Sequence, residues 1–280
     1  MEPRLDRAVS NQLKDILLRD AQREVPVVQS VSLFFWENMQ RWVEQVTYAT
    51  APFTIALSGP SGCVKSFIRE TMVSELNLVS TVSAFTQDNY YRDFEADFPH
   101  LPLDRFYDEI DFDDPAHIRF RHLGRDMAQL RNQPLGSSMK IPRLRFGTPT
   151  LKPAIIERDL ELRVTPFIIT EGIHAFYDPA ILPHYDLKIY VDVDEHVRRA
   201  RWLERNRLEN RGVTDNMWNT TVKCLNTHIL PTRPVADLVI NSNVPMEPLR
   251  SFFQEVIASM TSFSGLHRFQ APIASLNPQP

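Results

Sequence analysis

The stretch GPSGCVKS, residues 59 to 66, has the residue types and spacing of a loop that binds phosphate groups. In such a loop, backbone N–H groups and the N-terminus of the following helix hold phosphate oxygens. Lys65 is placed to reach the terminal phosphates of a nucleotide, and the Ser66 hydroxyl is placed to bind Mg²⁺. The stretch therefore predicts ATP and Mg²⁺ as cofactors, and predicts that the nucleotide contacts Gly59, Pro60, Ser61, Gly62, Cys63, Val64, Lys65 and Ser66.

Val64 departs from the pattern G-x-x-x-x-G-K-[ST], which has glycine at its sixth position. Glycine serves where φ is positive or where the backbone must come close to a ligand. A β-branched residue at positive φ is strained, at a cost of about 1–3 kcal/mol. Two alternatives follow: either the backbone at Val64 has a negative φ, or the loop is strained, and strain would weaken nucleotide binding without abolishing it.

Two acidic residues each follow an apolar segment of the kind that forms a buried strand. Asp88 comes after residues 80–86, and Glu171 comes directly after residues 166–170. Ligands gather at the carboxyl ends of strands in an open α/β sheet, so both carboxylates are expected to face the phosphate loop. Asp88 suits a general base for a hydroxyl group or a ligand for Mg²⁺, and the alternative interpretation is a turn cap.

The segments that position these residues alternate between short apolar runs and amphipathic patterns. The predicted strands are 53–58, 80–86, 166–170, 186–193 and 236–242. The predicted helices are 66–77, 115–132, 194–211, 214–230 and 246–261. This alternation predicts an α/β fold with a mostly parallel central sheet that is covered on both faces. Residues 140–165 break the alternation and read as an irregular or antiparallel excursion.

The chain divides into three regions by composition. Residues 1–50 are expected to form an N-terminal helical extension, with helices over 5–24 and 28–47. Residues 51–264 carry the phosphate loop and the alternating elements. The tail, 265–280, contains three prolines and is expected to lack fixed structure.

Charge and cysteine content exclude several classes of protein. The 280 residues carry a net charge of −4, which argues against a protein that coats nucleic acid or an anionic membrane. No stretch approaches the roughly 20 apolar residues of a membrane span. Two cysteines, Cys63 and Cys224, are too few for a disulfide framework. We therefore expect a cytoplasmic protein with no nucleic-acid or membrane partner, and a homo-oligomer remains open.

Six collinear segments resemble the uridine kinase family, within the wider uridine kinase/phosphoribulokinase group. They are GPSGCVKS, QDNYYRD (87–93), FDDPAH (112–117), TEGIHAFYDPAI (170–181), DLKIYVDVDEHVRRAR (186–201) and ILPTRPVADLVI (229–240). The resemblance runs from about residue 53 to residue 243. It implies the three-layer sandwich of P-loop NTPases, which makes 51–264 a P-loop kinase domain. It also implies an ATP- and Mg²⁺-dependent phosphotransferase, a kinase whose partner is a small-molecule acceptor with a hydroxyl group.

The resemblance also implies roles for individual residues. Asp88 is the catalytic base, Lys65 acts on the phosphates, and Ser66, Asp88 and Glu171 hold the metal. Tyr91 and Asp113 match positions that contact the nucleoside in the family.

An arginine-bearing segment follows the strand 186–193, and in the family such a lid clamps the triphosphate. Here Arg201 and Arg211 are the predicted catalytic arginines. Arg205 and Arg207 compete for one further position, and Arg205 is predicted to contact the substrate.

The acceptor segment IPRLRFGTPT, residues 141–150, departs from the family pattern. Of the residues that hold the base and sugar in the family, only Phe146 is retained. Arg145 stands where the family has aspartate. Arg145 and Phe146 are both predicted to bind the substrate. A pocket lined by Arg143 and Arg145 near Tyr91 would favour an anionic acceptor.

The alternative class is a catalytically impaired pseudokinase or nucleotide-binding module, suggested by Val64 and this altered segment. A GTPase-like switch is disfavoured because no N-K-x-D segment occurs.

Overall fold

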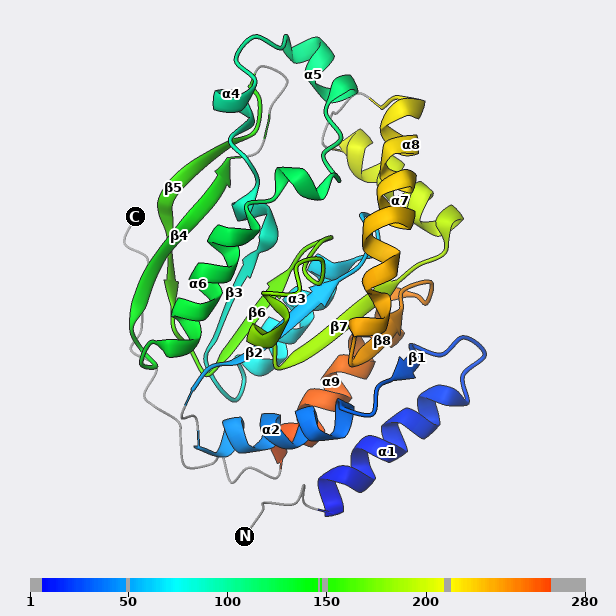
Figure 1. Cartoon of the computed structure of the whole chain (residues 1–280). Helices are drawn as coiled ribbons and strands as arrows, with labels where there is room; N and C mark the ends of the chain where they lie inside the picture. Colours follow the sequence, from blue (N-terminus) through cyan, green and yellow to red (C-terminus); the bar gives the residue numbers. More distant parts are fainter. Residues whose placement is uncertain (1–6, 49–50, 146, 148–150, 209–212, 263–280) are drawn as a thin grey trace, which may run out of the picture.

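The computed structural model describes residues 7–48, 51–145, 147, 151–208 and 213–262. Among these residues, six strands form a central sheet in the order β1-β8-β7-β2-β6-β3 (Figure 1). The strands are β1 Val28–Val31, β2 Phe53–Ser58, β3 Val82–Thr86, β6 Phe167–Glu171, β7 Leu187–Asp192 and β8 Leu238–Asn241. All neighbouring pairs are parallel except β1 and β8. The predicted α/β fold with a mostly parallel sheet is confirmed.

Helices cover both faces of this sheet. Their bounds are α1 Arg7–Ala21, α2 Phe35–Tyr48, α3 Lys65–Leu76, α4 Phe94–Asp97, α5 Leu103–Glu109, α6 Phe120–Asn132, α7 Glu195–Leu208, α8 Asp215–Cys224 and α9 Met246–Ser262. Within the described part of the chain, no helix is long and apolar enough to cross a membrane.

Side-chain alternation along the strands builds two separate cores. In β2, Ile55 and Leu57 face a core that α1, α2, α3 and α9 complete, whereas Ala56 faces the opposite core with α6. Every residue of β2 is buried, because successive side chains point to opposite faces and both faces are covered. The fold is therefore a three-layer sandwich with the sheet in the middle.

The N-terminal region contributes a strand as well as helices. The predicted helix over 28–47 is wrong for its first residues, because Val28–Val31 form β1 and pair antiparallel with β8. The helix begins only at Phe35. The backbone N–H groups of Val27 and Val28 donate to the buried Asp20 carboxylate at 3.1 and 2.7 Å, which fixes the chain as it enters the sheet. The proposed division of the chain at residue 50 stays a prediction.

The excursion predicted for 140–165 is an antiparallel hairpin beside α6 (Figure 1). It consists of β4 Ser138–Arg145 and β5 Ala154–Arg163. The register shifts between Ile141 and Arg143, at Pro142, which has no N–H to donate to the ladder.

Candidate active site

The phosphate loop connects β2 to α3, and its backbone is left-handed at three positions. Gly59 has φ 144°, Gly62 has φ 87°, and Val64 has φ 64° with ψ 28°. The structure thereby decides between the two alternatives for Val64: the residue lies in the left-handed region that valine rarely adopts. Its side chain is partly buried and packs against the core on the α3 face, which compensates part of the strain.

Both glycines of the loop lie against backbone from other elements. A Cβ at Gly59 would lie 2.3 Å from the Val191 carbonyl oxygen, and one at Gly62 would lie 3.0 Å from the Arg198 carbonyl oxygen. The loop is therefore packed between the end of β7 and the first turn of α7, with no room for side chains at these two positions.

Lys65 begins α3 and lies across the loop. Its ammonium group is buried, at 8% exposure of the residue, and donates to the Gly59 and Pro60 carbonyl oxygens at 2.8 and 3.0 Å. Lys65 lines a cavity of about 600 Å³ together with Ser66, Asp88 and Glu171. The structure thus brings these four predicted site residues together.

Glu171 ends β6, the strand beside β2 and β3, and receives two donors from α3. The Ser66 hydroxyl and Arg69 Nη1 each donate to Glu171 Oε1 at 2.9 Å. Glu171 is 7% exposed, so it meets the usual requirement that a buried carboxylate be paired and hydrogen-bonded. Arg69 carries no signal in the phosphate-loop pattern, although it lies one helical turn after Ser66.

Asp88 lies in a short 3₁₀ turn, Gln87–Tyr90, directly after β3. Its backbone N–H donates to the Thr86 hydroxyl at 3.2 Å, so this residue is capped rather than serving as the cap. The pKa of Asp88 is raised from 3.8 to about 6, first by burial and then by the negative charge of Glu171, against the opposing charges of Lys65 and Arg205. A pKa in this range suits a general base that works near neutral pH.

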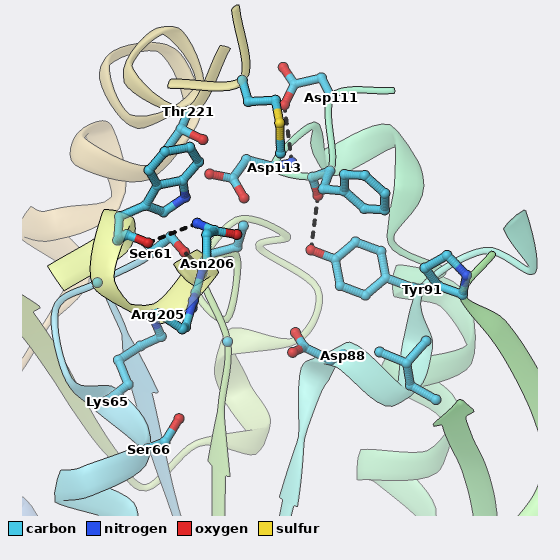
Figure 2. A pocket seen from close by; sticks show the side chains of 18 of the residues that line it. Ser61, Lys65, Ser66, Asp88, Tyr91, Asp111, Asp113, Arg205, Asn206 and Thr221 are labelled. Carbon is cyan, nitrogen blue, oxygen red and sulfur yellow. Dashed lines mark hydrogen bonds between the residues drawn. The ribbon is translucent and has the colours of Figure 1, made fainter. Parts of the chain in front are cut away.

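Figure 2 shows how these groups share the cavity. Lys65 and Ser66 lie at the lower left of the view, and Asp111 and Asp113 lie at the top. The Asp88 carboxylate points into the space between them. The phosphate loop therefore lines one side of the cavity, and the opposite side has the position to bind a second molecule.

That opposite part combines carboxylates with apolar side chains. The pKa of Asp113 is raised to about 6 by burial and by the charge of Asp111, against the opposing charges of Arg205 and Lys65. Asp113 Oδ2 is buried and has no hydrogen-bond partner among the described residues. Tyr91 donates its hydroxyl hydrogen to the Phe112 carbonyl oxygen at 2.9 Å, so its ring forms a fixed wall. The apolar lining here includes Phe94, Ile110, Phe112, Leu144, Pro153 and Ile173.

The arginines of α7 differ in what they contact. Arg205 lines the cavity and donates to the Ser61 hydroxyl of the phosphate loop at 2.9 Å. Arg201 also lines the cavity, and it donates to the Ser242 carbonyl oxygen at 2.8 Å. Arg207 instead pairs with Glu204 on the exposed side of the helix. Of the two competing arginines, Arg205 has the geometry for a role at the site. Arg211 lies outside the described residues.

In the described part of the chain, the arginines of the acceptor segment lie away from the cavity, and the predicted contact of Arg145 with the substrate stays a prediction. Arg143 pairs with Asp159 at 2.8 Å, and Arg145 pairs with Glu95. Neither residue lines the cavity, because carboxylates of β5 and α4 hold both guanidinium groups outside it. Phe146 lies outside the described residues, whereas Leu144 does reach the cavity.

Helix α8 supplies a wall that the sequence patterns did not single out. Met217, Thr220 and Thr221 line the cavity, as does the buried Asn206 of α7. Positions 217, 220 and 221 have the i, i+3, i+4 spacing of one helical face, which is the signal that could have found them.

The oxygen donors at this site fit Mg²⁺ bound together with a nucleotide. The Ser66 hydroxyl and the Asp88 and Glu171 carboxylates are hard ligands, which Mg²⁺ prefers. Within the described residues, no group of three or more His, Cys, Asp or Glu side chains is arranged to hold a metal ion. Mg²⁺ sites in kinases commonly use one or two carboxylates plus substrate phosphates rather than an all-protein cage.

Comparison with known proteins identifies the family. The sequence model of the Phosphoribulokinase / Uridine kinase family matches residues 54–247. The chain belongs to this family. Its members in the comparison include the uridine kinase of Saccharomyces cerevisiae, 31% identical over 200 residues, or 69% of this chain and 37% of that protein. The uridine kinase of Lactobacillus helveticus is 26% identical over 214 residues, or 74% of this chain and 96% of that protein.

One solved structure has the same fold. Phosphoribulokinase from Rhodobacter spheroides aligns with a TM-score of 0.51 at 14% identity, covering 68% of this chain and 69% of that one. The three-layer sandwich of this chain is therefore also the fold of that phosphoribulokinase. The match to the yeast relative spans little more than a third of that protein's length, so family membership by itself does not transfer its activity.

Proposed function

We propose that this protein is an ATP- and Mg²⁺-dependent kinase that phosphorylates a hydroxyl group of a small metabolite. The observation that carries the proposal is the shared cavity of Lys65, Ser66, Asp88 and Glu171. It joins a phosphate-binding loop, a metal-binding set of oxygens and a carboxylate whose pKa is about 6. The names of the relatives, uridine kinase among them, support the same class of reaction.

In this proposal, the oxygen of the acceptor hydroxyl forms a bond to the terminal phosphorus of ATP, and Asp88 accepts the proton of that hydroxyl. At the same time the bond from the terminal phosphorus to the bridging oxygen breaks, and ADP leaves. Lys65 and Arg205 stabilise negative charge on the phosphoryl oxygens, because both cations border the loop. When bound at Ser66, Asp88 and Glu171, Mg²⁺ would neutralise the charge of the phosphates. The buried Lys65 and Tyr91 help to exclude water from the reacting groups.

We propose further that the acceptor is uncharged, such as a nucleoside or another sugar-like compound. Carboxylates and apolar side chains line the part of the cavity opposite the loop, and the guanidinium groups of Arg143 and Arg145 are outside it. An anionic acceptor would meet the carboxylates of Asp111 and Asp113, and like charges placed side by side cost several kcal/mol. The unpartnered Asp113 Oδ2 is suited to accept a hydrogen bond from an acceptor hydroxyl.

Both cysteines of the chain, Cys63 and Cys224, are free and buried, which supports a reducing compartment such as the cytoplasm.

The test of the function is ADP release from Mg·ATP with a panel of nucleosides, free sugars, sugar phosphates and hydroxy acids. We expect release with one or more uncharged compounds and none when Mg²⁺ is omitted. ADP release with sugar phosphates alone would contradict the uncharged acceptor, and release with none of the panel would favour a nucleotide-binding module.

A further inference from the structure

Arg69 contacts the same carboxylate oxygen as Ser66. Its Nη1 atom lies 2.9 Å from Glu171 Oε1, and its side chain is 22% exposed. The other guanidinium contact, to Glu70 at 3.5 Å, involves a carboxylate that is 70% exposed. Of the two carboxylates, Glu171 is therefore the desolvated one, and solvent only weakly screens the Coulomb attraction between Arg69 and Glu171.

Two donors on Glu171 Oε1 change what this residue offers a metal ion. One carboxylate oxygen has about two acceptor sites, so the Ser66 hydroxyl and Arg69 occupy those of Oε1. The charge of Glu171 is also matched by the charge of Arg69. Because the Ser66 hydrogen is committed to Glu171, the lone pairs of the Ser66 oxygen are free for a cation in the cavity.

The charges around the loop do not favour a free divalent cation. Lys65, Arg69 and Arg205 oppose the two carboxylates of Asp88 and Glu171 close to the loop. A divalent cation that gives up part of its hydration shell requires strong negative charge in return. Nucleotide phosphates supply that charge when they bind at the loop.

We propose that Arg69 is a positioning residue that keeps Glu171 neutralised, so that a divalent cation binds this site only together with the phosphates of a nucleotide. The proposal rests on the proposed function for the existence of the metal site. It assigns to α3 a role beyond phosphate binding: Ser66 contributes the oxygen, and Arg69 determines that metal binding depends on nucleotide.

The test replaces Mg²⁺ with Mn²⁺ and measures bound Mn²⁺ by electron paramagnetic resonance, with the full chain and without turnover. For the wild type we expect bound Mn²⁺ in the presence of ADP and none in its absence at about 1 mM Mn²⁺. In Arg69→Met, nucleotide-free binding should tighten by about tenfold or more, because a nearby positive charge is removed. Arg69→Lys keeps the charge and should behave more like the wild type.

Arg250→Met is the matched control. Arg250 is on α9, its guanidinium carbon lies 5.3 Å from the Phe67 ring of α3, and its carboxylate partner is Glu247. This variant removes the same charge from the neighbouring helix and should leave nucleotide-free Mn²⁺ binding unchanged. Thermal unfolding of each variant checks the fold, and Arg69→Gln, with the same expectation, replaces Arg69→Met if that variant does not fold.

Two results would overturn the proposal. In the first, Arg69→Met and Arg69→Gln bind Mn²⁺ without nucleotide no more tightly than the wild type does. In the second, the wild type itself binds Mn²⁺ tightly without nucleotide. A wild type that fails to bind Mn²⁺ even with ADP would instead count against the proposed function. The two failures are therefore distinguishable.

Discussion

The Ser66 hydroxyl donates a 2.9 Å hydrogen bond to Glu171 Oε1 and so joins the first turn of α3 to the carboxyl end of β6. These residues are 105 positions apart in the chain. They meet because β2 and β6 are parallel neighbours, so the loop after β2 and the last residue of β6 lie at the same edge of the sheet. The candidate metal site is a direct consequence of this strand order.

Val64 is in the left-handed region, so Val64→Gly should relieve strain of about 1–3 kcal/mol. The entropy of glycine, about 0.5–1 kcal/mol, and the loss of the Val64 packing against the core oppose this gain. We expect the free energy of unfolding to stay within about 1 kcal/mol of the wild type and Mg·ATP binding to be unchanged or tighter. Chemical denaturation and a binding titration measure both. Val73→Gly, in the interior of α3, is the control and should destabilise. Clearly weaker nucleotide binding by Val64→Gly would mean that valine belongs to a working loop geometry.

The pKa of about 6 for Asp88 predicts the pH dependence of the reaction. A base must be deprotonated, so kcat/KM should be constant between pH 7 and 8 and should decrease below a pH of about 6. Asp113, with a pKa also raised to about 6, should make the decrease steeper if the acceptor binds its ionised form. An initial-rate profile from pH 5 to 8 measures this dependence. Activity that is independent of pH down to 5 would argue against Asp88 as the base.

The raised pKa of Asp88 also makes the free energy of unfolding depend on pH. The folded chain binds a proton at Asp88 more tightly than the unfolded chain, whose carboxyl has its ordinary pKa of 3.8. The free energy of unfolding should therefore decrease as pH rises from about 4 to about 6, and remain lower above that. Asp88→Asn removes this cost, so it should be more stable than the wild type by about 1–2 kcal/mol at pH 7.5 and equal to it near pH 4. A variant less stable than the wild type at pH 7.5 would contradict the assignment.

Arg205 and Arg207 form a matched pair on α7. Arg205→Gln removes the donor to Ser61 and a cation at the loop, so kcat/KM for ATP should decrease about 10- to 100-fold. Arg207→Gln breaks only an exposed pair with Glu204 and should change kcat/KM by less than about twofold. Steady-state kinetics with varied ATP separates the two. Equal losses in both variants would exclude the specific role of Arg205.

Local sequence patterns predicted most of the fold. The strand 53–58 was predicted with the bounds that the structure has, because a continuous apolar run after a break and before a phosphate loop has few other interpretations. The first residues of 28–47 were misassigned to a helix. Val27 and Val28 after Pro26 were a β-strand signal, but the strand exists only through its pairing with β8, more than 200 residues away.

The candidate site was predictable where a motif fixes a residue and was not where tertiary packing decides. Lys65, Ser66, Asp88 and Glu171 each end or follow a predicted element and meet at the cavity. Side-chain contacts decided the rest: no pattern distinguishes Arg205 from Arg207. In the same way, no spacing in the sequence shows that Glu95 and Asp159 hold Arg145 and Arg143 away from the cavity.

The most direct test of the proposed kinase activity follows the phosphoryl group itself. With [γ-³²P]ATP, Mg²⁺ and the best uncharged acceptor of the panel, the wild type should transfer the label into a phosphate ester of the acceptor. Asp88→Asn should still bind Mg·ATP and should transfer the label about 10²- to 10⁴-fold more slowly. Label that stays in ATP with every acceptor, or appears only as inorganic phosphate, while Mg·ATP is bound, would contradict the kinase proposal.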